Sequence, residues 1–305
     1  MDNSKLKRSV YPMPEFIRDA LLRDNLIEEY KMRPPYQQND YIGWITRAKR
    51  PETVQKRLNQ MIAELQDGDK YMGMDYKASK KGQNTRVANK KRILIMTAVS
   101  GEREAVLRGL DRLQINQKCD VLLAGVGPVA AAANTAKVLA TTKYELVIST
   151  GIGGGFIGRA EVGSLVLANE IVSADLGAET PEGFRSLDEL EFGSTKVEVE
   201  SSLVDQVTEA LRAAKLPVSV GPIITVSTVT GTAESAEEMC RRVPGAAAEG
   251  MEGYGVALAA QIFGVPALEI RAISNQVGPR DRSAWRIKEA FDVLEKAYTV
   301  LEELL

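Results

Sequence analysis

The run Glu145-Leu-Val-Ile-Ser-Thr-Gly-Ile-Gly-Gly-Gly155 decides the fold class. Its first half is a short apolar segment typical of a buried strand, and its second half is a cluster of glycines that follows the strand. Comparable apolar segments occur on both sides of it, at 92–98, 120–124, 164–174, 222–229 and 267–273. A central sheet of buried strands is therefore predicted for the last two thirds of the chain.

Helical patterns alternate with these strands, at 102–113, 128–140, 201–214, 233–242, 253–263 and 284–305. This alternation predicts an α/β domain over 92–305, with three layers and a mixed, largely parallel central sheet. In such sheets ligands bind beyond the carboxyl ends of the strands. We therefore expect the functional residues to lie directly after the strands.

The first part of the chain predicts a small, mainly helical domain over residues 10–76. Apolar residues recur at helical spacing after Pro14, again over 39–48, and a third time after Pro51, with Gly68 as the stop signal. Residues 77–91 are polar and basic without any apolar period, which predicts a linker. We therefore expect two domains joined by a flexible connection.

Composition excludes several classes of protein. Of the 305 residues, 44% are hydrophobic and 26% charged, which is ordinary for a globular protein. No stretch approaches the roughly 20 apolar residues of a membrane span, and the N-terminus lacks a signal-peptide pattern. The cysteines, Cys119 and Cys240, are too few for a disulfide scaffold, so a cytoplasmic location is expected.

The chain has no histidine. That excludes Ser-His-Asp and Cys-His catalysis and argues against a zinc or non-haem iron centre, so neither a metal nor a cofactor is expected. Acid–base chemistry must therefore be carried by Asp, Glu, Lys or Tyr.

Charge is distributed unevenly. Residues 1–90 hold 18 Lys and Arg against 12 Asp and Glu, and the rest of the chain holds 21 against 29. Acidic residues interleave with the basic ones throughout the first part, so no nucleic-acid partner is predicted.

Two segments that follow strands carry a resemblance when taken together. Ala248-Glu-Gly-Met-Glu252 and Arg271-Ala-Ile-Ser-Asn275 resemble the nucleoside phosphorylase/hydrolase superfamily, in its methylthioadenosine/S-adenosylhomocysteine nucleosidase branch. The longer runs 271–281 and 174–184 are similar to the futalosine hydrolases, which remove hypoxanthine from futalosine in the menaquinone pathway. The resemblance covers 92–305 and implies an N-glycosyl hydrolase with a small-molecule nucleoside substrate, which forms homo-oligomers through this domain.

The resemblance also implies roles for individual residues. Glu104 matches the carboxylate that activates the attacking water. Met251 and Glu252 match the pair at the ribose, where Glu252 accepts from the sugar hydroxyls. Arg271 matches an arginine beside the water and that glutamate, and both Arg271 and Ser274 are expected to bind the substrate.

Further matches concern the sugar and the base. Gly153 and Gly154 match backbone contacts, and Val229 with Thr230 matches the segment at the purine edge. Ile152 departs from a common serine and Val229 from a base-stacking phenylalanine, and Phe184 is a candidate substitute for the latter.

The residue types suit cleavage of an N-ribosidic bond. An oxocarbenium-like sugar is stabilised by hydroxyls held on a carboxylate, and without histidine a carboxylate is the available base for water. Asn275 stands where adenine-specific relatives carry Asp. Because Asn offers one acceptor and one NH₂ donor, it matches the O6 and N7–H of leaving hypoxanthine.

Residues 10–78 resemble the YdeI/OmpD-associated family, also called bacteriocin-protection proteins. Met13-Pro-Glu-Phe16, residues 33–45 and Ala48-Lys-Arg50 carry this resemblance.

Two other functions are compatible with the later domain. A purine nucleosidase or phosphorylase of other specificity is one, although Gly125-Val-Gly-Pro128 carries no arginine for phosphate. A non-catalytic nucleoside-sensing protein is the other. If the ligand has a carboxylate-bearing aromatic tail, Arg185, Arg280 and Arg282 are candidates to hold it, with Trp285 nearby.

Overall fold

The computed structural model describes residues 11–23, 26–68, 70–75, 92–110, 119–302 and 304. The chain divides into two compact units, Met1–Ala88 and Asn89–Leu305. The sequence-based boundaries at 10–76, 77–91 and 92–305 stay a prediction, and the predicted linker lies outside the described residues.

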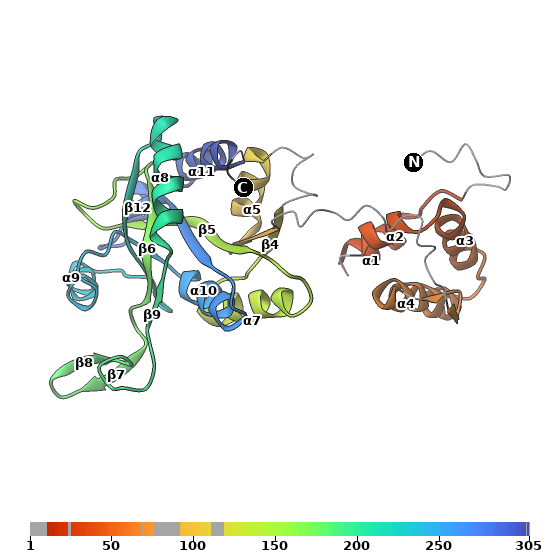
Figure 1. Cartoon of the computed structure of the whole chain (residues 1–305), viewed down its shortest axis with the longest axis horizontal. Coiled ribbons are helices and arrows are strands. Elements are labelled where there is room, and N and C mark those ends of the chain that lie inside the picture. The colour runs from red at the N-terminus through yellow and green to blue at the C-terminus, as the bar shows by residue number, and fades with distance from the viewer. Residues whose placement is uncertain are drawn as a thin grey trace. The chain divides into compact units, whose positions relative to one another are not determined.

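The first unit is helical, as expected. It contains α1 (Glu15–Arg23), α2 (Ile27–Met32), α3 (Pro35–Thr46), α4 (Pro51–Asp67) and a short hairpin of β1 (Lys70–Tyr71) and β2 (Met74–Asp75) (Figure 1). Pro35 is the first residue of α3. Proline lacks a backbone N–H, but the helix makes no hydrogen bond with the N–H at this position, so proline is well suited to it. Gly68 ends α4 at a φ of 78°.

Glu64 organises the core of this unit. Its carboxylate accepts from the Tyr41 hydroxyl at 2.7 Å and from the backbone N–H groups of Met72 and Gly73 at 2.8 and 2.7 Å. These contacts tie α4 to α3 and to the hairpin turn. The predicted helical character of this part of the chain is confirmed by the four helices between Glu15 and Asp67.

The second unit is built on an eight-stranded mixed sheet. Its strands are β3 (Ile93–Thr97), β4 (Cys119–Leu123), β5 (Leu146–Gly155), β6 (Leu165–Ser173), β9 (Lys196–Glu198), β10 (Val218–Thr225), β11 (Ala248–Gly250) and β12 (Ala267–Gln276). The order is β11-β10-β6-β12-β5-β3-β4, and β9 pairs with β6. Because β11 also pairs with β5, five of these strands close into a ring.

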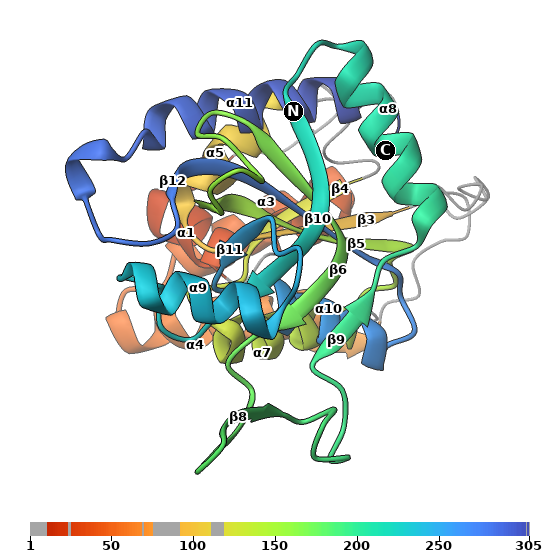
Figure 2. The same ribbon diagram turned by 90° about the vertical axis from the view of Figure 1, so that its left-hand side faces the viewer.

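Helices cover both faces of the sheet (Figures 1 and 2). On one side lie α5 (Ser100–Gly109), α8 (Ser201–Ala213) and α11 (Ile287–Leu301), and on the other lie α7 (Pro128–Leu139) and α10 (Gly253–Ile262). Every residue of β3 is buried, which explains its uninterrupted apolar sequence. The predicted three-layer α/β class with a largely parallel sheet is confirmed.

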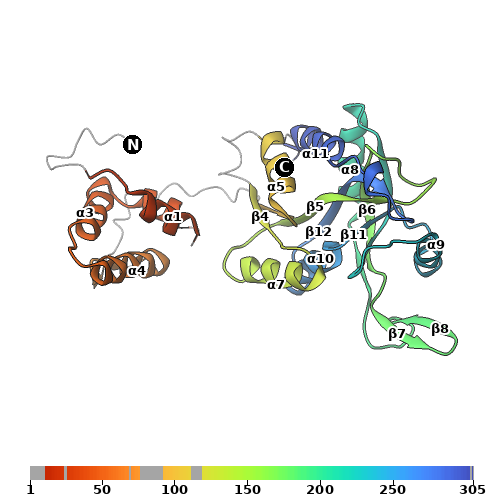
Figure 3. The same ribbon diagram turned by 180° about the vertical axis from the view of Figure 1, so that it is seen from behind.

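Two further elements lie outside these layers. The hairpin of β7 (Gly177–Thr180) and β8 (Gly183–Ser186) projects from the sheet, and α9 (Ala233–Arg242) lies on the same side of the unit, as the reverse view in Figure 3 shows. Among the described residues, none of the helices has the length and apolar character needed to cross a membrane.

The glycine cluster differs from the expectation. It does not follow the strand but continues it, so that β5 runs to Gly155, pairing with β12 on one side and with β11 at its end. The register of the β5–β12 pairing sets Gly151 beside Arg271 and Gly154 beside Asn275. The motif residues of two separate chain segments are thereby aligned.

Candidate active site

Four backbone segments meet along the glycine run of β5. They are the start of α5, the end of β12, the turn between β11 and α10, and the loop after β10. Gly151 has no side chain, which leaves room for the Glu102 carboxylate. A Cβ on Gly151 would lie 2.3 Å from the Glu102 carboxylate, so only glycine fits there.

Glu102 lies at the start of α5 and is 3% exposed. Its Oε2 accepts from the N–H groups of Ala98 and Val99 at 2.8 and 3.2 Å, and its Oε1 accepts from Ile152 N–H at 2.9 Å. Burial raises the pKa of this carboxyl group, while Arg271 opposes the change. A buried carboxylate held in one orientation with a raised pKa is suited to act as a base near neutral pH.

Glu104 does not occupy this place. It lies two residues further along α5 and is exposed to solvent. A rotation of about 200° separates residues two apart on a helix, so Glu102 and Glu104 cannot face the same site. The structure corrects the assignment based on the resemblance: Glu102, and not Glu104, is the candidate base.

Arg271 and Glu252 form a buried ion pair beside Glu102. Arg271 is 1% exposed, and its Nη1 donates to Glu252 Oε2 at 3.1 Å and to the Ile152 carbonyl at 3.3 Å. The other oxygen of Glu252 accepts from Gly127 N–H at 3.2 Å. The predicted pairing of Glu252 with Arg271 is therefore present in the structure.

A second carboxylate binds the same guanidinium group. Glu269 Oε1 accepts from Arg271 Nε at 2.8 Å, and its side chain is completely buried. Sequence reasoning missed Glu269 because it lies inside an apolar strand pattern. A charged residue within such a run was the available signal.

Ser274 and Asn275 lie at the end of β12, next to Gly153 and Gly154. The Ser274 hydroxyl lies 3.2 Å from the Gly153 carbonyl and 2.8 Å from Asn275 Oδ1. Asn275 Nδ2 donates to the Gln276 carbonyl at 3.0 Å. The amide of Asn275 is half-buried and oriented by these neighbours, which places one donor and one acceptor beside the glycine run.

The loop after β10 is attached to β11 through Glu249. Thr230 donates its N–H to Glu249 Oε1 at 3.0 Å and its hydroxyl to the other oxygen, while Val229 is exposed. Glu249 itself pairs with Gly154 in the sheet. Thr230 is thus connected to the glycine run through Glu249. Met251 lies half-buried in the turn before Glu252.

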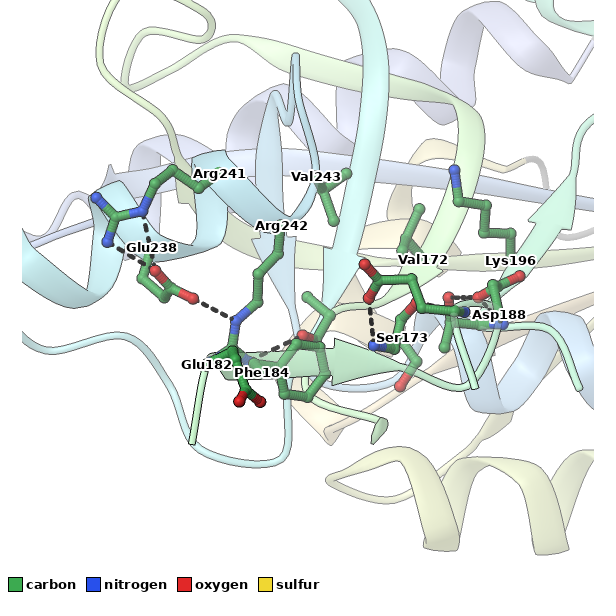
Figure 4. A pocket seen from close by; sticks show the side chains of 15 residues that line it. Val172, Ser173, Glu182, Phe184, Asp188, Lys196, Glu238, Arg241, Arg242 and Val243 are labelled. Atoms are coloured by element: carbon green, nitrogen blue, oxygen red, sulfur yellow. Dashed lines mark hydrogen bonds and ion pairs between the residues drawn. The ribbon is translucent and has the colours of Figure 1, made fainter. Parts of the chain in front are cut away.

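Phe184 lies elsewhere. It is part of β8 and lines a cavity of about 560 Å³ between the β7–β8 hairpin, the end of β6 and α9 (Figure 4). The Arg242 guanidinium lies 3.8 Å from the centre of its ring. None of Glu102, Glu252 and Arg271 lines this cavity. Among the residues that the structure describes, Phe184 therefore lies away from the carboxylate cluster.

The three arginines that are candidates to hold a carboxylate-bearing tail lie in two different places. Arg185 is exposed on the β7–β8 hairpin, whereas Arg280 and Arg282 both face the Trp285 ring, at 5.3 and 5.9 Å from its centre. The N–H of Arg280 donates to the Gly231 carbonyl, next to Thr230. Arg280 is therefore the member of the set whose backbone contacts the loop at the site.

The charges of the cluster suit a cationic transition state. Three buried carboxylates, Glu102, Glu252 and Glu269, surround one guanidinium, so the ionised cluster is net negative. Within the described residues, no group of His, Cys, Asp and Glu side chains is arranged to hold a metal ion. The arrangement can activate water and stabilise a developing positive charge.

Both units match a known family model. Residues 92–305 match the family model of the Phosphorylase superfamily, and residues 10–68 match that of the bacteriocin-protection, YdeI or OmpD-associated proteins. The chain is 47% identical to the futalosine hydrolase of Streptomyces coelicolor over 230 residues, which is 70% of this chain and 96% of that protein. It is also 47% identical to the futalosine hydrolase of Acidothermus cellulolyticus over 218 residues, 68% of this chain and 89% of that protein.

Solved structures share the fold. The futalosine hydrolase of Helicobacter pylori superimposes with a TM-score of 0.62 at 19% identity, covering 71% of this chain and 99% of that one. The family model over residues 92–305 shows that the chain is a member of the Phosphorylase superfamily. Within that superfamily the chain belongs to the futalosine hydrolase family, through residues 92–305.

Proposed function

We propose that this chain hydrolyses the N-ribosidic bond of futalosine, releasing hypoxanthine and dehypoxanthine futalosine, as a step in menaquinone biosynthesis. The observation that carries the proposal is the buried cluster of Glu102, Glu252 and Arg271 beside the glycine run, together with Asn275 at its far end. The relatives named futalosine hydrolase support the choice of substrate.

The proposed reaction begins with water at Glu102. An ionised carboxylate has about four lone-pair sites. Three backbone N–H groups already donate to this one, so a site remains for a water molecule. Glu102 removes a proton from that water as it adds to C1 of the ribose.

Glu252 stabilises the sugar as the bond breaks. It accepts hydrogen bonds from the ribose hydroxyls, and its negative charge lies close to the oxocarbenium-like ring. Met251 and the backbone of Gly153 and Gly154 contact the sugar and the base. The electron pair of the broken bond leaves with the purine, which takes a proton from solvent at N7, and Glu102 returns the proton of the attacking water to solvent.

The hydrogen bonds that Arg271 already makes favour hydrolysis over phosphorolysis. A phosphate ion needs unengaged cationic donors, but Arg271 already donates to both Glu252 and Glu269. The nearby backbone donor, Gly127 N–H, is also used by Glu252. The groups beside the ribose are thus arranged for water.

The proposal also covers the location, the oligomeric state and the partners of the enzyme. A cytoplasmic location fits the two free cysteines, of which Cys240 is exposed. We infer a homo-oligomer formed through 92–305, and Val129 and Ile157, which expose 81% and 79% of their surface, are candidates for its interface. We propose no nucleic-acid partner.

The proposal is tested by comparing kcat/KM for futalosine, inosine, methylthioadenosine and aminodeoxyfutalosine with the full chain. Free base is separated and quantified by chromatography. Futalosine is expected to be the best substrate. A higher kcat/KM for methylthioadenosine would instead indicate a nucleosidase of adenine specificity, and no base release from any of the four would favour the nucleoside-sensing alternative.

Asn275→Asp is expected to change the choice of base. A carboxylate would face O6 of hypoxanthine with lone pairs, whereas it can accept from a 6-amino group. The mismatch should cost on the order of 1–3 kcal/mol, or roughly tenfold or more in the ratio of kcat/KM for futalosine to that for aminodeoxyfutalosine. Asn59→Asp on exposed α4 is the matched control. An unchanged ratio in Asn275→Asp would remove Asn275 from base selection.

A further inference from the structure

Glu269 is a buried carboxylate that the reaction above does not use. It lies on β12, is 0% exposed, and has one oxygen on Arg271 Nε at 2.8 Å. Its second oxygen, Oε2, has no hydrogen-bond partner among the residues described. A Cβ on Gly253 would lie 2.0 Å from that oxygen, so the glycine at the start of α10 leaves room for the Glu269 carboxylate. An uncompensated buried oxygen costs stability, which calls for a functional reason.

The position of Glu269 relative to Glu252 gives such a reason. Arg271 presents Nε to Glu269 and Nη1 to Glu252, so two carboxylates compete for one positive charge. A Cβ on Gly250 would lie 2.9 Å from the guanidinium carbon, so the backbone also closes around Arg271. The remaining donor, Nη2, lies 3.4 Å from Ser149 Oγ. Arg271 is held from all sides and cannot turn away from either carboxylate.

We propose that Glu269 is a positioning residue that orients Arg271 and, in its ionised form, neutralises the guanidinium charge, so that Glu252 keeps its full negative charge for the ribosyl cation. This inference rests on the proposed hydrolysis of futalosine. When Glu269 is protonated, Arg271 is balanced by Glu252 instead. The attraction between Glu252 and the developing cation then weakens, because charges interact strongly in a water-excluded site.

The surroundings of Glu269 make it a group that titrates near neutral pH. Burial raises its pKa to about 7, Arg271 on the same strand opposes this, and Glu252 at the start of α10 adds to it. Glu102 of α5 acts on the cluster through Arg271. The proposed effect on catalysis should therefore grow as pH rises through about 7.

The test compares kcat and KM of wild type and Glu269→Gln across pH 5.5–8.5. Gln keeps an oxygen for Arg271 Nε but cannot carry the negative charge. The ratio of wild-type kcat to variant kcat is expected to be near one at the acid end and to rise to roughly tenfold at the alkaline end. KM should change by less than about twofold, since Glu269 does not touch the substrate. Using the ratio cancels the titration of Glu102, which is present in both proteins.

Glu295→Gln is the matched control, because it makes the same change at the surface ion pair with Arg108. Its kcat ratio should stay near one at every pH. A ratio for Glu269→Gln that does not vary with pH would overturn the proposal while leaving futalosine hydrolysis intact.

A second readout does not depend on turnover. A carboxyl group with a raised folded-state pKa stabilises the fold below its ordinary pKa of 4.5, and this stabilisation is lost as pH rises to about 7. The unfolding free energy of wild type should therefore fall relative to that of Glu269→Gln over this interval. Parallel curves for the two proteins would overturn the assignment even if futalosine were not the substrate.

Discussion

Glu102→Gln is expected to lower kcat for futalosine by about 100- to 10,000-fold, the usual contribution of a general base. The amide cannot take a proton from water, while the site for the substrate is left in place. Binding of the substrate, measured by calorimetry, should therefore change little. Because Gln places an NH₂ where backbone donors point, the melting temperature should be recorded beside the activity.

The matched control is Glu104→Gln. The same change is made two residues away on the same helix, at an exposed position. Its kcat should stay within about twofold of wild type, as expected of a surface substitution. If Glu104→Gln lost activity and Glu102→Gln kept it, the assignment drawn from the resemblance would be right and the structural correction wrong.

The pH profile gives a second check on Glu102. Only the ionised form is a base, and burial raises the pKa of this group. Activity should therefore fall on acidification at a higher pH than an ordinary glutamate would give.

Glu252→Gln is the other substitution with a large expected effect. Replacing the carboxylate by an amide removes the negative charge that faces the ribosyl cation, so kcat should fall by about 100- to 1,000-fold. The fold should survive, since Arg271 keeps its ion pair with Glu269. Activity is measured by hypoxanthine release, and folding by circular dichroism.

The surface variant Glu295→Gln again serves as the control, with wild-type activity expected. Near-wild-type kcat in Glu252→Gln would show that ribose stabilisation does not depend on this carboxylate. A rise in KM with unchanged kcat would be equally inconsistent, because the charge is expected to act in the transition state and not in substrate binding alone.

The fold class could be predicted because apolar strands and helical patterns alternate with few exceptions. Every strand of 92–305 that the sequence predicted is present in the sheet. The projecting β7–β8 hairpin was missed, since its short strands are half-exposed and carry no apolar run. The closure of β11 onto β5 was also missed, because a three-residue strand gives too little pattern.

The site was predicted in part. Glu252, Arg271 and Asn275 could be proposed as site residues because they lie within contiguous motifs, and the structure places them along the glycine run. Glu102 was confused with Glu104 because the spacing of Ser100-Gly-Glu-Arg-Glu104 alone does not fix where α5 begins. Once the helix starts at Ser100, its rotation decides which glutamate faces the glycine run. Phe184 was assigned through its motif, yet its strand belongs to the separate hairpin.

The central claim is that the chain uses water, activated beside Glu252 and Arg271, to release hypoxanthine from futalosine. The most direct measurement is mass spectrometry of the products formed by the full chain in phosphate-free buffer prepared with ¹⁸O-water. Hydrolysis at this site is expected to give free hypoxanthine and dehypoxanthine futalosine that carries one ¹⁸O atom when trapped immediately by reduction. Release that begins only after phosphate is added, with a sugar 1-phosphate as the product, would contradict it.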